Sequence, residues 1–292
     1  MGWFEERGGL DGTVAVVTGG AGGLGEAIVL DLAENGVRPA VVDIDEAAVD
    51  AMRGTFADRG IDGIVVHGDA RDPEVLEALF AAVDDRWGRL DILVNVVGGT
   101  FRAPFTDTTP KGWDALLRTN LIHVFHACSL AIPRMRAGGR GGSIVNVSTI
   151  EAHRAAPGFA VYSAAKAGVE QFARTLAVEV APDGIRVNNV APDVAPTPNM
   201  AKLAGPASEA STSPAAVRIA IPMARTGDPT DVSGCVVFLA SAVSSYVTGQ
   251  TLHPDGGTFA SSGWFNWPGT GWANFPPVDL IDDREPNEGD SE

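Results

Sequence analysis

Short apolar runs alternate with longer amphipathic runs along most of the chain. The short runs are rich in β-branched residues and apolar at nearly every position, which is typical of strands covered by helices on both faces. They predict strands at Thr13–Thr18, Pro39–Asp43, Gly63–His67, Asp91–Val96, Ser143–Ser148 and Ile185–Val190. The longer runs predict helices at Leu24–Asn35, Glu46–Arg59, Pro73–Trp87, Lys111–Arg136, Ala160–Val180 and Pro229–Ser241. This alternation predicts an α/β fold with a doubly wound parallel sheet and helices on both faces.

The alternation continues to about Leu252 without a linker that could separate two cores, so residues 1–260 are predicted to form a single domain. The segment at about 192–222 is rich in Pro, Ala and Ser and is predicted to be a lid. An arm follows over 261–292, with aromatic residues between positions 264 and 275 and an acidic end that should stay solvated. Its prolines disfavour a helix or a central strand and predict an extended arm. The rings either pack on a neighbouring subunit or at the substrate mouth, or the arm has no role.

Acidic residues outnumber basic residues by 37 to 21, which gives a formal net charge of −16 at pH 7. This balance repels phosphate backbones and argues against a nucleic-acid partner. No apolar run approaches the ~18 residues of a membrane span, and the first residues lack the apolar core of a signal peptide, so we expect no membrane partner and a cytoplasmic protein. Cys128 and Cys235 are expected to be reduced and buried. His123 and His126 share a helix face without an accompanying carboxylate or cysteine, and no metal site is expected.

A glycine-rich sequence, TGGAGGLG at 18–25, lies between the first predicted strand and its helix. Glycines there allow a tight turn and let backbone N–H groups approach a pyrophosphate at the helix N-terminus. The position directly after an apolar strand favours a dinucleotide site over a simple turn. The residues expected to contact the dinucleotide are Gly19, Gly22, Gly23, Leu24 and Gly25.

Asp43 ends the second predicted strand. A carboxylate at that place can accept hydrogen bonds from both ribose hydroxyls of the adenosine and repels a 2′-phosphate. Since no Lys or Arg stands in the glycine-rich loop or at Ile44 to hold such a phosphate, the sequence predicts NAD rather than NADP. Asp69, followed by Ala70, is placed to contact the adenine ring, although an Asp at this point can also start a turn.

Ser148, Tyr162 and Lys166 are the candidate catalytic residues. Ser148 ends the fifth predicted strand, while Tyr162 and Lys166 stand four residues apart on one helix and share a face. A free tyrosine titrates near ~10. Because a neighbouring ammonium and a positive nicotinamide ring both favour phenolate, we expect Tyr162 to have a lowered pKa and to act as the acid/base. Lys166 would also hold the nicotinamide ribose, and Ser148 would hydrogen-bond the substrate oxygen.

With these motifs the chain resembles the short-chain dehydrogenase/reductase family, in its single-domain Rossmann branch, over about residues 10–257. The similarity lies in the glycine-rich loop, the strand end at Asp43, GDARD at 68–72, NVVGG at 95–99, RTNL at 118–121, Ser148, YSAAK at 162–166 and PDGG at 254–257. It implies a catalytic tetrad of Asn120, Ser148, Tyr162 and Lys166. In that scheme Asn120 holds a water that links Lys166 to solvent.

The resemblance also implies further contacts to the cofactor. These lie at Asn95, Gly98, Pro192, Val194 and Thr197. Asp193 stands where the family usually has Gly. Its carboxylate is expected to stabilise the oxidised nicotinamide ring, to shape the lid entrance, or to turn away into solvent.

The expected activity is that of an NAD-dependent oxidoreductase that interconverts a secondary alcohol and a ketone. Phe101, Phe105, Ile150 and the aromatic arm indicate a bulky apolar substrate, such as a steroid, terpenoid or fatty-acyl-derived alcohol, although the two phenylalanines fit core packing equally well. Glu151 and His153 either line this pocket or lie on the surface. The alternatives are a non-catalytic NAD(H)-sensing protein and a lyase or epimerase on the same scaffold.

The resemblance implies assembly through two long helices into a homotetramer, or a homodimer. The predicted helices at 111–136 and 160–180 are apolar enough to pack on copies of themselves about a two-fold axis.

Overall fold

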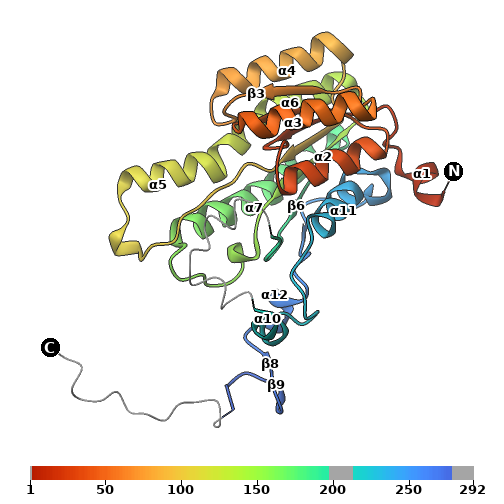
Figure 1. The fold of residues 1–292 in the computed structure, drawn as a ribbon. Coiled ribbons are helices and arrows are strands. Elements are labelled where there is room, and N and C mark those ends of the chain that lie inside the picture. Colours follow the sequence, from red (N-terminus) through yellow and green to blue (C-terminus); the bar gives the residue numbers. More distant parts are fainter. Residues whose placement is uncertain (1, 197–212, 278–292) are drawn as a thin grey trace.

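Seven parallel strands form the central sheet (Figure 1). The structure is a computed structural model that describes residues 2–196 and 213–277. In spatial order the strands are β3 (Ile64–His67), β2 (Arg38–Asp43), β1 (Val14–Thr18), β4 (Ile92–Asn95), β5 (Gly142–Val147), β6 (Ile185–Val190) and β7 (Thr251–Leu252). The strand order reverses between β1 and β4, the place where doubly wound sheets bind ligands at their carboxyl ends. The six predicted strands are confirmed, and the two-residue β7 extends the sheet at its edge.

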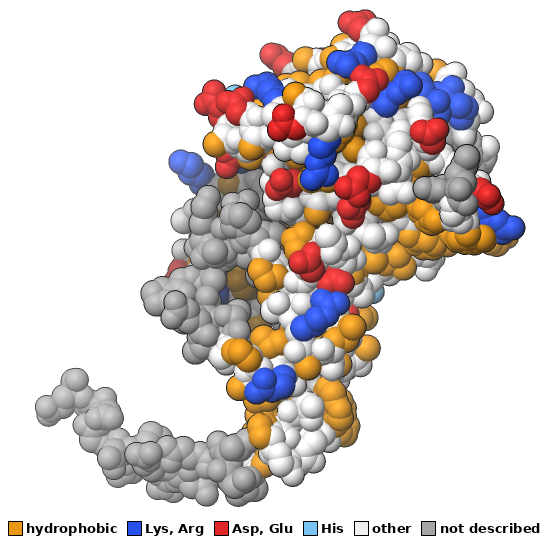
Figure 2. Space-filling view, turned by 45° about the vertical axis from the view of Figure 1, so that its right-hand side comes forward, with side chains coloured by type: hydrophobic (Ala, Val, Ile, Leu, Met, Phe, Trp, Pro, Cys, Tyr) orange, Lys and Arg blue, Asp and Glu red, His pale blue; other side chains and the backbone are white. Residues whose placement is uncertain are grey.

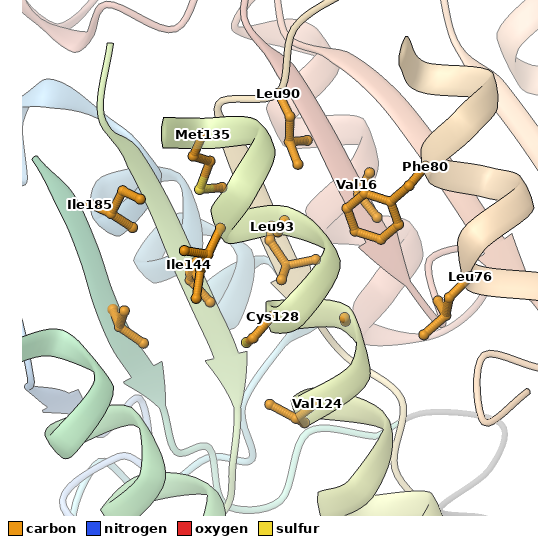
Figure 3. Packing of buried hydrophobic residues seen from close by; sticks show 14 of the residues in the cluster. Val16, Leu76, Phe80, Leu90, Leu93, Val124, Cys128, Met135, Ile144 and Ile185 are labelled. Carbon is orange, nitrogen blue, oxygen red and sulfur yellow. The ribbon is translucent and has the colours of Figure 1, made fainter. Parts of the chain in front are cut away.

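Helices cover both faces of the sheet. On one face lie α4 (Pro73–Trp87), α6 (His123–Gly138) and α7 (Ala160–Val180), and on the other α2 (Leu24–Glu34), α3 (Glu46–Arg59) and α11 (Pro229–Ala240). Figure 3 shows the core between the sheet and α4, α6 and α7, where Phe80 of α4 lies against Val16 of β1 and Cys128 of α6 lies near Leu93 of β4 and Ile144 of β5. Because the strands bury both faces, they are apolar at nearly every position. The predicted α/β fold with a doubly wound sheet is confirmed.

The helix ends follow from local sequence. The side chain of Asp72 accepts a hydrogen bond from the backbone N–H of Glu74, and Pro73 occupies the first turn of α4, where its missing N–H costs nothing. The first long helix, α2, ends at Glu34 with Asn35 as its C-cap, and Gly36 follows with a φ of +81°. These two ends are the ones that the sequence predicts.

The predicted helix Lys111–Arg136 is wrong as a single α-helix. The chain instead forms α5 (Pro110–Leu117), a π-helical turn over Arg118–Ile122, and α6. Asn120 lies in the π turn and is completely buried. A π turn adds a residue to the helical repeat, so it re-aims side chains, and such turns are frequent at functional sites. Apolar periodicity does not reveal it, because the pattern on either side stays helical.

One helical segment among the described residues, Pro110–Gly138, is long and apolar enough to cross a membrane, with a mean hydropathy of 1.3 over its most apolar window. The sequence-based expectation that no run reaches this length does not hold for this segment. Its α6 part packs on the sheet within the core, and core helices of soluble proteins meet the same length and composition limits.

The C-terminal arm folds back on itself. Strands β8 (Phe265–Trp267) and β9 (Gly271–Ala273) form an antiparallel hairpin that lies beside α10 (Pro214–Ala220) and α12 (Thr258–Ser261), away from the central sheet (Figure 1). The prediction of an extended arm without a helix holds for the individual strands but misses the turn that pairs them. The acidic end and residues 197–212 of the predicted lid lie outside the described residues.

Candidate active site

The glycine-rich loop has the geometry of a cradle at the N-terminus of α2. Gly19 adopts a φ of +67°, and its N–H donates to the carbonyl of Val42 over 2.7 Å. Gly23 precedes α2 with a φ of +57°. A Cβ atom on Gly25 would overlap the carbonyl oxygen of Gly19. Only glycine fits these positions, so the backbone N–H groups can approach a pyrophosphate closely.

Asp43 lies beside this loop at the end of β2. Its Oδ2 accepts from the N–H of Ala21 over 3.0 Å, and its Oδ1 accepts from the N–H of Asp45 over 3.1 Å. The carboxylate is therefore fixed next to the glycine loop, where an adenosine ribose would lie. Leu24 begins α2. Gly22 has open space around it, since a Cβ added there would lie no closer than 3.9 Å to its nearest neighbour.

The carboxylate of Asp69 forms an ion pair with a neighbouring side chain. Its carboxylate pairs with the guanidinium of Arg71 at 2.6 Å, and this hydrogen bond lowers the pKa of Asp69. Arg71 also donates to the Thr119 hydroxyl over 3.3 Å. The side chain of Ala70 is buried. An adenine ring at this place would meet an ion pair rather than a free carboxylate.

A second loop approaches the same site after β4. The side chain of Asn120 donates to the carbonyls of Gly99 (2.8 Å) and Leu116 (2.9 Å), and its Oδ1 accepts from the N–H of Gly99 over 3.1 Å. A Cβ on Gly98 would lie 3.3 Å from both Asn120 Oδ1 and Lys166 Nζ. The structure therefore brings Asn120, Gly98 and Lys166 together, as the resemblance implies.

Lys166 is a buried cation on α7. Its Nζ donates to the carbonyl of Val147, at the end of β5, over 2.8 Å. Burial lowers the pKa of Lys166 to about 8, while the charge of Glu170 acts in the opposite direction. The ammonium is thus held beside Gly98 by the carbonyl at the end of β5.

Tyr162 meets Thr149 rather than Ser148. The pKa of Tyr162 is raised by burial, partly offset by a hydrogen bond with the Thr149 side chain, while the charge of Glu151 raises it further. The predicted lowering is wrong for the protein without its cofactor, because desolvation of the phenolate outweighs the nearby hydrogen bond and Lys166 directs its Nζ to Val147.

Ser148 lies on the opposite side of this strand end. Its hydroxyl donates to Oε1 of Glu170 over 2.6 Å, and both residues are buried. The sequence predicts that Ser148 hydrogen-bonds the substrate oxygen, but in the structure its hydroxyl is directed to Glu170 instead. Side chains alternate between faces at the end of a strand, and Ser148 follows the face of Asn146, which α7 covers. Glu170 is absent from the sequence-based site, although its position four residues after Lys166 places it on the same helix face.

The described part of the segment after β6 is held by backbone hydrogen bonds to two other segments. The carbonyl of Pro192 accepts from the N–H of Ile150 over 3.1 Å, and the carbonyl of Val194 accepts from that of Gly227 over 2.9 Å. The side chain of Asp193 is only 10% exposed and lies 3.4 Å from Arg154, so the solvent alternative for Asp193 is wrong. Burial raises the pKa of Asp193. Thr197 lies outside the described residues.

The candidate pocket residues separate into different environments. Phe101 and Phe105 are 42% and 55% exposed and line a small hollow with Phe159, so the core-packing alternative is wrong for them. Ile150 is completely buried and belongs to the interior. Glu151 pairs with Arg154 at 2.8 Å.

Asn95 lies buried in the sheet below the site. Its side chain is buried and donates to Asn146 of the neighbouring strand over 2.9 Å. The thiol of Cys128 lies below it at 3.9 Å, and burial raises the pKa of that thiol to about 12. Cys128 is buried as predicted, whereas Cys235 is half-buried, and both are free.

The geometry agrees with what sequence comparison finds. The family described as enoyl-(acyl carrier protein) reductase matches residues 19–258. The chain belongs to the short-chain dehydrogenase/reductase family. Curated members include the 3-oxoacyl-[acyl-carrier-protein] reductase FabG of Thermotoga maritima, 37% identical over 85% of this chain and 98% of that protein. A tropinone reductase homolog of Arabidopsis thaliana is also 37% identical, over 87% of this chain and 92% of that protein.

Solved structures of the family superpose on the same range. A putative gluconate dehydrogenase from Agrobacterium tumefaciens is 32% identical with a TM-score of 0.79, covering 86% of this chain and 97% of that one. A putative short-chain dehydrogenase/reductase from Burkholderia xenovorans is 35% identical with a TM-score of 0.78, covering 87% and 98%. The fold and the oxidoreductase class of this chain are those of the short-chain dehydrogenases/reductases, whose members bind a nicotinamide cofactor.

Proposed function

We propose that this chain is an NAD-dependent oxidoreductase that interconverts a secondary alcohol and a ketone by hydride transfer, with Tyr162 as the acid/base. The observation that carries the proposal is the arrangement at the start of α7. There the Tyr162 side chain is hydrogen-bonded by Thr149, and the buried ammonium of Lys166 follows one helical turn later beside Gly98. This is the constellation that proton transfer to a reacting oxygen requires.

Each residue of the candidate site has a separate role in the proposed reaction. Tyr162 takes the proton of the alcohol, or returns it to the ketone oxygen. Thr149 hydrogen-bonds the same oxygen, in the role that the sequence assigned to Ser148. Lys166 supplies a positive charge near the phenolate, and Asn120 fixes the loop at Gly99 against the π turn. When bound, the nicotinamide supplies or accepts the hydride, and its oxidised ring adds a positive charge that favours the phenolate.

The glycine cradle and Asp43 support NAD as the cofactor. The Asp43 carboxylate is held beside the loop by two backbone N–H groups, where it can accept from ribose hydroxyls. A 2′-phosphate at the same place would meet a negative charge, and the loop offers no basic side chain to balance it.

The exposed rings of Phe101 and Phe105 support a largely apolar substrate. Relatives named for the reduction of 3-oxoacyl groups and of tropinone are consistent with a ketone substrate. The substrate class that we propose is a bulky steroid, terpenoid or fatty-acyl-derived alcohol. Exposed apolar residues on the long helices, Phe125 and Val178 among them, support a homotetramer or homodimer. A cytoplasmic location stays a prediction.

The test is NADH formation from NAD with a panel of such alcohols, using the two tyrosines of the chain as a matched pair. Tyr162→Phe removes the proton carrier and should lower turnover by about 10² or more, with NADH binding retained. Tyr246 is fully exposed, so Tyr246→Phe is the control and should keep the normal rate. An equal rate in Tyr162→Phe would overturn the proposed acid/base. NADH binding without turnover of any alcohol would instead favour a sensing protein.

A further inference from the structure

Four polar side chains form a row across neighbouring strands of the central sheet. Asn95, Asn146, Asn189 and Thr251 occupy matching register positions on β4, β5, β6 and β7. The side-chain amide of each Asn donates to the next residue, over 2.9, 3.1 and 3.2 Å. All three donors point in the same direction, toward β7.

The hydrogen bonds end on one carboxylate. The Thr251 hydroxyl donates to Oε2 of Glu170 over 3.4 Å, and the Ser148 hydroxyl donates to Oε1 over 2.6 Å. The Oδ1 atom of Asn95, at the other end, has no hydrogen-bond partner among the described residues. A row of bonds that share one direction polarises every member, so the donors converge on Glu170 and stabilise its negative charge. These donors give hydrogen-bond partners to both oxygens of a carboxylate that is only 4% exposed.

Glu170 stands one helical turn after Lys166 on α7, and both side chains are buried. An ammonium in such surroundings loses its hydration and needs a compensating negative charge. The carboxylate of Glu170 raises the pKa of Lys166, against the burial that lowers it to about 8.

Among the described residues near this pair, the other titratable groups are histidines, which are neutral or positive, and Tyr162, so none of them supplies a negative charge at pH 7. His123, on α6, is buried, and burial lowers its pKa to about 3, so it is neutral at pH 7. Tyr162 is neutral at pH 7, because burial raises its pKa. His153 lies with its Nε2 2.7 Å from Glu170 Oε2, although not aligned for a hydrogen bond, and His253 packs against His153 with a lowered pKa.

We propose that Glu170 is a positioning residue whose carboxylate, held ionised by the side-chain hydrogen bonds across β4 to β7, keeps Lys166 in its ammonium form beside Tyr162. The inference rests on the proposed function for its catalytic meaning. Its physical content concerns the charge of Lys166 and can be measured without any substrate.

The composition of the chain makes this measurement direct. The sequence has three lysines, Lys111, Lys166 and Lys202, so a protein grown with [ε-¹³C]lysine gives three signals. Single Lys→Arg substitutions at 111 and 202 assign the third signal to Lys166. The ¹³C shift of each signal, followed from pH 6 to pH 10 in the cofactor-free full-length protein, reports the titration midpoint of each lysine.

In Glu170→Gln the titration midpoint of Lys166 should fall by about one pH unit, the usual effect of removing an opposite charge nearby. Glu170→Asp should recover part of the difference. The matched control is Glu179→Gln, which removes the same charge from an exposed position on the same helix and should leave the midpoint unchanged. A folded Glu170→Gln protein with the wild-type midpoint would overturn the proposal.

Two further variants keep the test decisive if Glu170→Gln does not fold. Thr251→Val and Ser148→Ala each remove one donor to Glu170 and should shift the Lys166 midpoint downward by a smaller amount. If both proteins fold and neither moves the midpoint, the proposal fails. The outcome is independent of the alcohol panel: an unchanged Lys166 midpoint in an active dehydrogenase defeats this inference alone, whereas a shifted midpoint in a protein without turnover defeats the proposed reaction alone.

Discussion

The neighbouring hydroxyls of Ser148 and Thr149 lead to opposite consequences when each is removed. Thr149→Val keeps the shape of the side chain but removes the group that hydrogen-bonds Tyr162. Ser148→Ala removes the donor to the buried carboxylate of Glu170, 2.6 Å away, and leaves the Thr149 hydroxyl in place. The pair therefore separates a role in the reaction from a role in stability.

The magnitudes follow from the partners. A donor aimed at a reacting oxygen contributes about 10²–10³ in turnover, so Thr149→Val should lose about that factor. A hydrogen bond to a charged group contributes about 1.5–3 kcal/mol to folding, so Ser148→Ala should lower the free energy of unfolding by that amount, with turnover within about threefold of wild type. At roughly 2–4 °C per kcal/mol for a chain of this size, the Tm of Ser148→Ala should fall by about 3–12 °C. Thr149→Val also loses the acceptor for the N–H of Glu151, which costs about 1 kcal/mol.

The assay is NADH formation with the best alcohol of the panel, together with thermal unfolding of each variant. Thr149→Ser is the control, because it returns the hydroxyl and should restore most of the turnover. The reasoning is refuted if Ser148→Ala loses a hundredfold in turnover while Thr149→Val retains its rate. In that case the serine would turn toward the substrate when the cofactor binds.

Three other perturbations test separate parts of the structure. NADH should bind at least tenfold more tightly than NADPH, a difference of about 1.4 kcal/mol in binding free energy. In a fluorescence titration, Asp43→Ala should reduce this difference in affinity. Equal affinities for the two cofactors in the wild type would contradict the role of Asp43. The stability of Lys166→Met relative to the wild type should be highest below pH 8 and should fall as the pH rises from 8 toward 10.5. In that window the unfolded chain binds the lysine proton while the folded protein has released it, so the wild type gains stability as the pH rises. Urea unfolding at pH 7 and pH 9.5 measures the free energy of unfolding of the variant and of the wild type. A difference between the two proteins that is the same at both pH values would argue against the lowered pKa of Lys166. Truncation after Gly263 removes the hairpin beside α10, and Figure 2 shows this region standing apart from the body of the molecule. The truncated protein should bind NADH normally but show a raised substrate KM or a smaller assembly, and an unchanged KM with an unchanged mass would leave the arm without a function.

Local features of the sequence were sufficient to predict most of the fold. Continuous apolar runs identify strands that are covered on both faces, and Asp72-Pro73 marks the start of α4. The glycine loop is readable because a Cβ at Gly25 would overlap the backbone, a restriction that belongs to the loop itself. The shared helix face of Tyr162 and Lys166 is equally local, since four residues make about one turn.

The arrangement of the site was decided by contacts between distant segments. Whether Ser148 or Thr149 meets Tyr162 depends on how the end of β5 is oriented against α7, and adjacent residues point to opposite sides of a strand. Glu170 acquires its importance only when β4 to β7 align their polar side chains in register and direct them toward it. The pKa of Tyr162 has the same origin, because desolvation depends on everything packed around the ring. The sequence by itself determined the elements and their chemistry, whereas the tertiary structure decided which groups face one another, because burial and long-range hydrogen bonds exist only after the layers have packed.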